Sequence, residues 1–519
     1  MRRRLVLGAA VPSALAAAVV VACGPSSDDL CEFTLSCVND AVPDSGLIDG
    51  GGDGDATLPD DGGNQDVSAD VLPDNAPPGC DPSADPKDSL ACVSSDFGIF
   101  VSTKGSDSAA GTKDAPLATL TKALEKTSAL KSRIYVCSSD GHYTGQVTID
   151  ANHDGLSIYG GWDCSTWSYT TTRATLASTD PAFALKISQT QKKIVISDLE
   201  IAGAPGTAQN TSSIAAIMDT VANVVLRRAK LVAKDGFPGT PGTSNAANLG
   251  AAAQGNQGST GGGGLAKTCT CSDGDTVGQA GGGPPNGGGT AGTPSLGASP
   301  PDNGAGGAGG QTACTDNGGA GFGHKGAPGA QGSPGTNATA VGSWSDSGWT
   351  PASGAAGTKG ARGQGGGGGG ATAGGGGSGG GCGGCGGDPG GGGAGGGASI
   401  GLVSVSSMVT LQICALVTGA AKNGGAGGGG QAAQTGGASG NVVSGTGCQA
   451  GNGGNGGNGG PGGGGAGGIS VGIFYRGTKP ARSADTTVTL GTAGSGGAAG
   501  AGGTDAGIAT TPKDEMQIP

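Results

Sequence analysis

Two pairs of closely spaced cysteines are the residues in this sequence that most directly suggest chemistry. They are Cys269-Thr-Cys271 and Cys382-Gly-Gly-Cys385. Such spacing suits zinc ligation or thiol–disulfide exchange, because two thiolates near each other can share a metal or form one redox-active disulfide. Both pairs, however, lie in glycine-rich sequence with no nearby His and no strand-to-helix context. We therefore expect structural disulfides, with Cys382 and Cys385 as candidates, and neither a metal site nor a cofactor.

Other motifs of catalysis are missing from the sequence. The chain has three histidines, His142, His153 and His324. It contains no nucleophile elbow, no P-loop and no Gly-x-Gly-x-x-Gly placed after a strand, and scattered glycine matches are expected by chance at this composition. The sequence thus assigns no catalytic residue and favours a protein that is not an enzyme.

Glycine is distributed very unevenly along the chain. Of 519 residues, 119 are Gly. Residues 236–398 hold 63 of them and residues 419–468 hold 25, whereas residues 91–235 hold only 10. Because Gly removes no apolar side chain from water, a hydrophobic core must lie outside the two glycine-rich segments.

The N-terminus has the layout of a secretory signal. Three arginines at residues 2–4 precede an apolar, Ala-rich run over residues 5–22, which ends in Val-Val-Ala before Cys23. This ending resembles the lipobox of bacterial lipoproteins, which implies that Cys23 is acylated, with palmitate among its chains, and becomes the new N-terminus. Gly24 in place of Asp implies sorting to the outer membrane. An uncleaved transmembrane helix is the alternative, which the proline within the run and the polar residues after it disfavour.

The net charge belongs to one segment. The chain has 27 Lys and Arg against 39 Asp and Glu, a net charge of −12. Residues 24–90 hold 16 acidic residues and one Lys, and the rest of the mature sequence is neutral. A stretch poor in apolar residues and rich in one charge stays extended, so it is expected to be a disordered tether. Its aspartates lack the spacing of a calcium loop, and no nucleic acid is expected as a partner.

Residues 91–235 contain many apolar runs of three to five residues, which suggest a sandwich, a barrel or a solenoid. The pattern Ser213-Ile214-x-x-Ile217 followed by Val224-x-Leu226 recurs over residues 399–411, and each copy runs into glycine after its last strand. Stacked repeats tolerate insertions at equivalent places, so the sequence favours an all-β solenoid over a β-sandwich. Thr119 can cap a helix that begins near it and reaches Leu130.

The opening of this region resembles a known family. Residues 99–107, Gly111-Thr112 and the run Ala115-Pro116-Leu117 to Leu124, followed by residues 134–136 and 141–143, are similar to the start of pectin-lyase-like right-handed parallel β-helices. That resemblance implies a right-handed parallel β-helix whose open end is covered by an N-terminal capping helix. Residues 157–164 also resemble a segment of surface lipoproteins from Gram-negative bacteria. These features are informative about fold and nearly silent about activity.

Composition and pattern together divide the chain into seven parts. They are a lipoprotein signal peptide (1–22), an acidic disordered tether (23–90), a β-helix domain (91–235), a glycine-rich insert (236–398), a returning coil (399–418), a second glycine-rich insert (419–468) and a last coil with the C-terminal tail (469–519).

The glycine-rich inserts have a local period of three. Asn452, Asn455 and Asn458 follow one another at every third position within nearly pure glycine. Three residues per turn is the period of a polyproline-II-type helix, and such helices can bond side by side where no Cβ intervenes. The inserts resemble the glycine-rich, PGRS-like repeats of bacterial surface proteins. A polyglycine-II-like bundle and irregular, disordered chain both stay open, whereas a collagen triple helix needs longer uninterrupted triplets.

Cysteine pairing is expected because the chain is predicted to be exported. Of the 14 cysteines, lipidation of Cys23 leaves 13, an odd number that leaves one unpaired. The candidate disulfides are Cys31 with Cys37, Cys80 with Cys92, and Cys137 with Cys164.

Five charged residues could matter if the family resemblance extended to activity. Polysaccharide lyases of this fold use a Lys or Arg base near calcium-binding aspartates, which draws attention to Asp198, Glu200, Arg227, Arg228 and Lys230. These residues alternate with apolar ones, as expected for the outer face of strands. A solvated ladder of charges is therefore the favoured interpretation.

The sequence thus predicts a non-enzymatic outer-membrane lipoprotein, lipid-anchored and exposed at the cell surface, with a structural or adhesive role. The expected partners are the membrane, through the N-terminal lipid, and surface glycans or neighbouring cells. The alternative is a carbohydrate-binding or polysaccharide-lyase-type protein.

Overall fold

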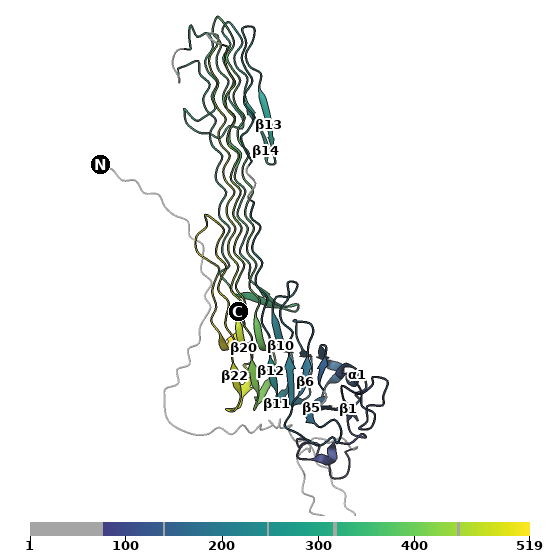
Figure 1. The fold of residues 1–519 in the computed structure, drawn as a ribbon. Coiled ribbons are helices and arrows are strands. Elements are labelled where there is room, and N and C mark those ends of the chain that lie inside the picture. The colour runs from purple at the N-terminus through teal and green to yellow at the C-terminus, as the bar shows by residue number, and fades with distance from the viewer. Residues whose placement is uncertain (1–75, 139–140, 246–248, 315–318, 444–446, 519) are drawn as a thin grey trace, which may run out of the picture. The chain divides into compact units, whose positions relative to one another are not determined.

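The computed structural model describes residues 76–138, 141–245, 249–314, 319–443 and 447–518. Regular structure in these ranges is mostly β (Figure 1). The helical elements there are short: η1 (Leu90–Cys92), α1 (Leu120–Glu125) and η2 (Ala151–His153). None of them is long and apolar enough to cross a membrane. The signal peptide, Cys23 and the pair Cys31 and Cys37 lie outside the described residues.

Most strands form three parallel sheets, which consecutive strands enter in turn. The first sheet contains β1 (Ile99–Val101), β2 (Arg133–Cys137), β5 (Ser157–Trp162), β8 (Ile194–Ser197), β11 (Val224–Arg227), β18 (Val409–Gln412) and β21 (Ala481–Arg482). The second contains β4 (Val147–Ile149), β7 (Leu185–Ser188), β10 (Ser213–Asp219), β17 (Ser399–Val405), β20 (Ser470–Arg476) and β23 (Lys513–Gln517). The third contains β3 (His142–Thr144), β6 (Ala174–Ala177), β9 (Leu199–Ala202), β12 (Lys230–Val232), β19 (Ala415–Val417) and β22 (Thr487–Thr489).

This arrangement corrects the predicted fold class. The prediction was a single right-handed parallel β-helix, and the described residues instead form separate parallel sheets of seven, six and six strands, with almost no helix. Two antiparallel hairpins add to them: β13 (Lys267–Cys271) with β14 (Gly274–Gly278), and β15 (Gly342–Ser345) with β16 (Gly348–Pro351). The error has a physical source, because runs of three to five apolar residues predict short strands but do not fix how those strands group into sheets.

The repeat seen in the sequence has a direct structural counterpart. Ser213 lies opposite Ser399 in the pair β10–β17, and Val224 lies opposite Val409 in the pair β11–β18. β20 continues this register, because Ser470 lies opposite Ser399. Segments that resemble each other in sequence are therefore hydrogen-bonded neighbours in the same sheet.

The hydrophobic core is shared by all three sheets. Leu226 of the first sheet, Leu402 of the second and Leu416 of the third are fully buried in one cluster. α1 contributes Leu120 and Leu124 to this cluster and contacts β1 and β4. The helix ends at Glu125 rather than near Leu130.

Aromatic side chains form a second buried layer, outside the first sheet. Phe100, Tyr135 and Tyr159 come from adjacent strands, and their ring centroids are 5.1 and 5.9 Å apart. Contacts of this kind add about 0.5–1.5 kcal/mol per pair beyond the burial of area. The hydroxyl of Tyr135 donates to the carbonyl of Cys92 at 2.7 Å, which ties the N-terminal loop to this face.

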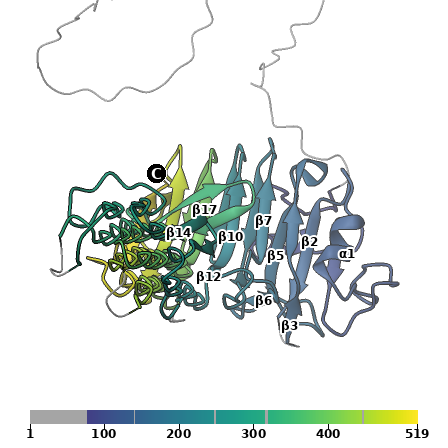
Figure 2. The ribbon, with the colours of Figure 1, turned by 90° about the horizontal axis from the view of Figure 1, so that it is seen from above.

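The glycine-rich inserts leave the sheets at equivalent places. Each long connection, after β12 or β19, runs from the third sheet to the second, and the shorter one after β22 does the same. The inserts continue as extended segments that run side by side away from the sheets in Figure 1 and are viewed along their length in Figure 2.

Backbone hydrogen bonds join these segments with a period of three residues. The N–H of Gly387 donates to the carbonyl of Gly457 at 3.0 Å, and three residues further along both segments Gly390 donates to Gly460 at 2.9 Å. The carbonyl of Gly387 accepts in turn from Gly360 at 3.0 Å, so one segment bonds to two neighbours. The described parts of both inserts are therefore ordered, and three residues per turn is the period of a polyproline-II-type helix.

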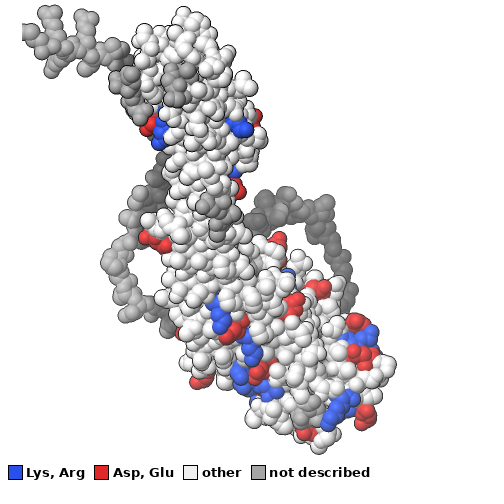
Figure 3. All heavy atoms as spheres, turned by 45° about the horizontal axis from the view of Figure 1, so that its top comes forward, with Lys and Arg blue, Asp and Glu red and all other residues white. Residues whose placement is uncertain are grey.

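Packing inside this glycine bundle, the described parts of residues 236–398 and 419–468, requires the absence of Cβ atoms. A Cβ added to Gly457 would lie 1.8 Å from the carbonyl oxygen of Ala330, far inside van der Waals contact. Charged side chains are also sparse there: on the face in Figure 3, Lys, Arg, Asp and Glu gather mainly over the sheets. The bundle thus depends on main-chain bonding rather than on a hydrophobic core.

Candidate functional site

The charged residues singled out in the sequence lie in ion pairs. Arg228 donates to both carboxylate oxygens of Asp198, at 2.8 and 2.6 Å, and to Asp85 at 2.6 Å. Arg227 lies 3.2 Å from Asp85, and Lys230 lies 3.1 Å from Glu200 on the neighbouring strand. The Asp85 and Asp198 side chains are only 9% and 7% exposed.

Burial and ion pairing have opposite effects on the pKa values of Asp85 and Arg228. Burial by itself would raise the pKa of Asp85, but the hydrogen bond and the charge of Arg228 lower it, together with hydrogen bonds from the Lys87 N–H and from Arg227. Burial likewise opposes the charge on Arg228, yet Asp198 and Asp85 raise its pKa. Tyr169 donates to Asp198 at 3.0 Å, and burial followed by the Asp198 charge raises its pKa. A base for proton abstraction must be deprotonated, so the raised pKa of Arg228 does not suit that role.

Asp85 lies in a segment that contacts the sheets. Residues 76–90, which composition assigned to the tether, are described in the structure and belong with the sheets. They are held there by the Asp85 ion pairs and by the disulfide Cys80–Cys92.

Disulfides account for most cysteines in the described residues. Cys80–Cys92 and Cys137–Cys164 are bonded, the two pairings that the sequence suggested there. Cys382 and Cys385 are bonded to cysteines of β13 rather than to each other. The disulfides in the glycine bundle are Cys269–Cys382, Cys271–Cys385 and Cys314–Cys448. Cys414 is a free, buried thiol, and burial raises its pKa.

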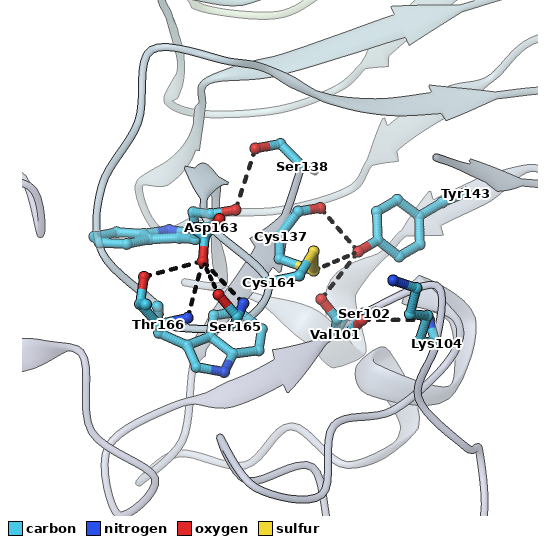
Figure 4. Close-up of a disulfide and its surroundings, with 12 residues drawn as sticks. Val101, Ser102, Lys104, Cys137, Ser138, Tyr143, Asp163, Cys164, Ser165 and Thr166 are labelled. Atoms are coloured by element: carbon cyan, nitrogen blue, oxygen red, sulfur yellow. Dashed lines mark hydrogen bonds between the residues drawn. A yellow bond between two sulfur atoms is a disulfide. The ribbon is translucent and has the colours of Figure 1, made fainter. Parts of the chain in front are cut away.

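Figure 4 shows the hydrogen-bonded surroundings of the disulfide Cys137–Cys164. The hydroxyl of Tyr143 lies 2.9 Å from the carbonyl of Cys137. The carboxylate of Asp163 accepts bonds from the side chain and N–H of Ser165 and from Thr166, which hold its pKa far below the ordinary value. The disulfide joins the loop after β5 to the end of β2, the Asp163 bonds hold that loop in a turn, and Tyr143 ties β3 to β2.

The histidines do not form a catalytic group either. His153 lies 2.8 Å from Asp150 and His324 lies 2.8 Å from Asn303, while His142 is exposed on β3. A hollow of about 900 Å³ beside His153 is lined by residues of 127–132, 151–156 and 192–193. No group of three or more His, Cys, Asp or Glu in the described ranges could hold a metal ion.

One pocket that combines aromatic and polar side chains was not predicted from the sequence. The hairpin β15–β16 lies over the outer side of the second sheet and places Trp344 opposite Trp349. A pocket of about 100 Å³ lies between this hairpin and the sheet. Two of the four tryptophans of the chain stand in this one hairpin, and this concentration was the available signal. The pocket is lined by Ala182, Phe183, Lys186, Asn210, Ser212, Ile214, Ile217, Asp219, Trp344, Ser345, Asp346, Ser347, Gly348 and Trp349.

One side of the pocket is a packed aromatic side chain, and the other carries polar side chains. Trp349 is 7% exposed, and its ring packs edge-on against Phe474 with centroids 5.1 Å apart. Its indole Nε1 is buried without a hydrogen-bond partner in the described structure. The side chains of Lys186, Asn210 and Asp346, in contrast, line the pocket without a hydrogen-bond or ion-pair partner among the described residues.

The fold and these sites define a mostly β protein built of parallel sheets, with an ordered glycine-rich bundle joined to them. Comparison with known protein families, with curated proteins and with solved structures finds no match.

Proposed function

We propose that this chain is a non-enzymatic lipoprotein of the outer membrane, anchored through Cys23, that displays its glycine bundle at the cell surface in a structural or adhesive role. The main support for this proposal is the structure of the glycine bundle. Its extended segments are hydrogen-bonded to one another at every third residue and cross-linked by three disulfides. A hydrogen-bonded, weakly charged extension of this kind suits display at the cell surface better than turnover of a substrate.

The chemistry of the chain agrees with export. The disulfides persist only in an oxidising compartment, as expected for a protein that leaves the cytoplasm. Several acyl chains on Cys23 would make a stable anchor, whereas a single chain would bind reversibly. The lyase alternative has less support, because Arg227 and Arg228 are both held by Asp85.

Surface display is tested on intact Gram-negative cells that express the full chain. Protease added outside should digest the wild-type protein, and Cys23→Ser should move the protein from the membrane fraction to the soluble fraction. Cys414→Ser, which changes a thiol buried among the sheets, is the matched control and should stay membrane-bound. Digestion only after the outer membrane is permeabilised would overturn surface display, and membrane retention of Cys23→Ser would overturn the lipid anchor.

An adhesive role is tested with the same cells. Cells that express wild-type protein should settle on surfaces or on one another faster than cells with an empty vector. Cells expressing Cys23→Ser should lose this gain because the protein is released. An equal rate in all three strains would leave only the structural role.

A further inference from the structure

We propose that the pocket between the hairpin β15–β16 and the second sheet binds one neutral pyranose ring of a glycan. This inference rests on the proposed function and deepens it, since it names the class of partner for adhesion. The pocket joins parts of the chain far apart in sequence, with Lys186 on β7, Asp219 on β10 and Trp344 on β15.

The hairpin is positioned by apolar packing that does not use the whole of its surface. Trp349 contacts Phe474 and belongs to the same buried cluster as Ile400 and Val471. Trp344 is only partly buried against this cluster and lines the pocket. Gly348 ends the turn between β15 and β16 with a φ of +106°, a conformation that residues with a side chain disfavour. Glycine at this position therefore favours the chain reversal that forms the hairpin. Trp349 thus anchors the hairpin, and Trp344 is left to contact a ligand.

The lining matches the two kinds of surface on a sugar. A pyranose ring has an apolar face of C–H groups, which packs against an indole, and an edge of hydroxyls, which need donors and acceptors. Asn210 supplies an amide, Asp346 a carboxylate and Lys186 an ammonium group at the pocket, and each is free of other partners in the described residues. Asp219 adds a second carboxylate.

Size and charge narrow the class of ligand. A volume of about 100 Å³ holds several waters, and so it admits part of one ring rather than an oligosaccharide. Two carboxylates face one ammonium, which disfavours an acidic sugar. An apolar peptide side chain would fill the aromatic part but leave the polar groups unpaired, at a cost of about 1–3 kcal/mol for each group that it buries. A neutral hexose satisfies both parts.

The buried Nε1 of Trp349 is a second unusual feature of this place. Most buried polar groups have a hydrogen-bond partner, and exceptions tend to have a functional reason. Trp349 keeps its orientation for packing on Phe474 despite that cost, which preserves the wall of the pocket.

The test uses the full purified chain and methyl glycosides of glucose, galactose, mannose and N-acetylglucosamine at up to about 10 mM, because contact with one ring gives weak binding. Saturation-transfer NMR should detect at least one of these glycosides. Trp344→Ala should weaken that binding at least tenfold, whereas Trp344→Phe should keep most of it. Lys193→Ala, in the separate hollow beside His153, is the matched control and should bind like wild type.

Two results would overturn the proposal. One is the absence of saturation transfer from all four glycosides to folded wild-type protein. The other is unchanged binding in Trp344→Ala. Neither result touches surface display, which is judged by protease access on cells, so the sugar site and the proposed function fail in different experiments.

Discussion

The side-chain oxygen of Asn455 accepts a hydrogen bond of 3.0 Å from the backbone N–H of Gly436. Asn452 and Asn458 make the same contact with Ser439 and Ala433, each at 2.8 Å. The three-residue spacing of these asparagines therefore matches the spacing of N–H groups on the neighbouring segment. Amide side chains take over the acceptor role where a carbonyl of another segment is not in place.

Replacing all three asparagines with alanine should weaken the glycine bundle. Each loss removes a hydrogen bond worth about 1 kcal/mol, so the triple variant should lose about 2–3 kcal/mol, seen as earlier thermal unfolding. The triple Asn→Asp variant keeps an acceptor oxygen at each position and should lose less. Equal melting of the alanine variant and wild type would contradict the proposed role of these side chains.

Neighbouring glycines in the bundle should differ sharply in their tolerance of a methyl group. A Cβ on Gly428 would lie 1.9 Å from the carbonyl oxygen of Thr243, whereas a Cβ on Gly429 would lie 3.9 Å from Ala501. Gly428→Ala should lower the free energy of unfolding by about 1–3 kcal/mol, because the two segments must separate to admit the methyl group. Gly429→Ala should change stability by only a few tenths of a kcal/mol, since its backbone does not need glycine. Thermal melting and the rate of protease cleavage compare the two variants, and similar behaviour would contradict close packing at Gly428.

Features that depend on local sequence were predicted correctly. The pairing of Cys137 with Cys164 was predicted from the sequence, and these cysteines are bonded. The exit points of the inserts and the period of the asparagines were also visible, because both follow from local repetition. The grouping of strands into sheets was wrong, since it depends on how distant segments pack and not on any local pattern.

The other contacts that were not predicted from the sequence join residues far apart along the chain. Cys269 and Cys382 lie 113 residues apart, and nothing in glycine-rich sequence between them fixes which residues meet. Nothing in the sequence distinguishes Asp85 from the other aspartates of residues 24–90. Among the described aspartates of that stretch, Asp85 is the one that pairs with Arg228 and Arg227. Trp344 meets Asp219 across the pocket only because the insert returns to the sheets before it extends again.

Stability should depend on pH through Asp85. Its pKa is lowered in the folded chain, so the folded state favours the charged form. This contribution is fully present above the unfolded pKa, near 3.8, and is lost as the pH falls through the lower folded value. Asp85→Asn should therefore cost about 2 kcal/mol at pH 7, and the difference from wild type should shrink below about pH 4. Chemical denaturation at pH 7, 4 and 3 measures this, with Asp88→Asn, an exposed neighbour, as the control. A constant difference across these pH values would mean that charge is not the cause.

The two disulfides that join β13 to the segment Cys382–Cys385 should protect the hairpin β13–β14. Lys267 is exposed at the start of β13, and the strand is held to the bundle through Cys269–Cys382 and Cys271–Cys385. Without these bonds β13 keeps only its ladder with β14, and a two-stranded ladder is marginally stable in water. The remaining ties to the bundle then lie on β14, where Thr276 donates to the carbonyl of Gly383 and Val277 bonds to Thr293. Replacing all four cysteines with serine should therefore speed tryptic cleavage after Lys267, detected by mass spectrometry of the fragments. Cys80→Ser with Cys92→Ser removes a disulfide at the sheets and should leave this cleavage unchanged. If the four-serine variant is cleaved at Lys267 no faster than wild type, backbone hydrogen bonds alone hold the hairpin.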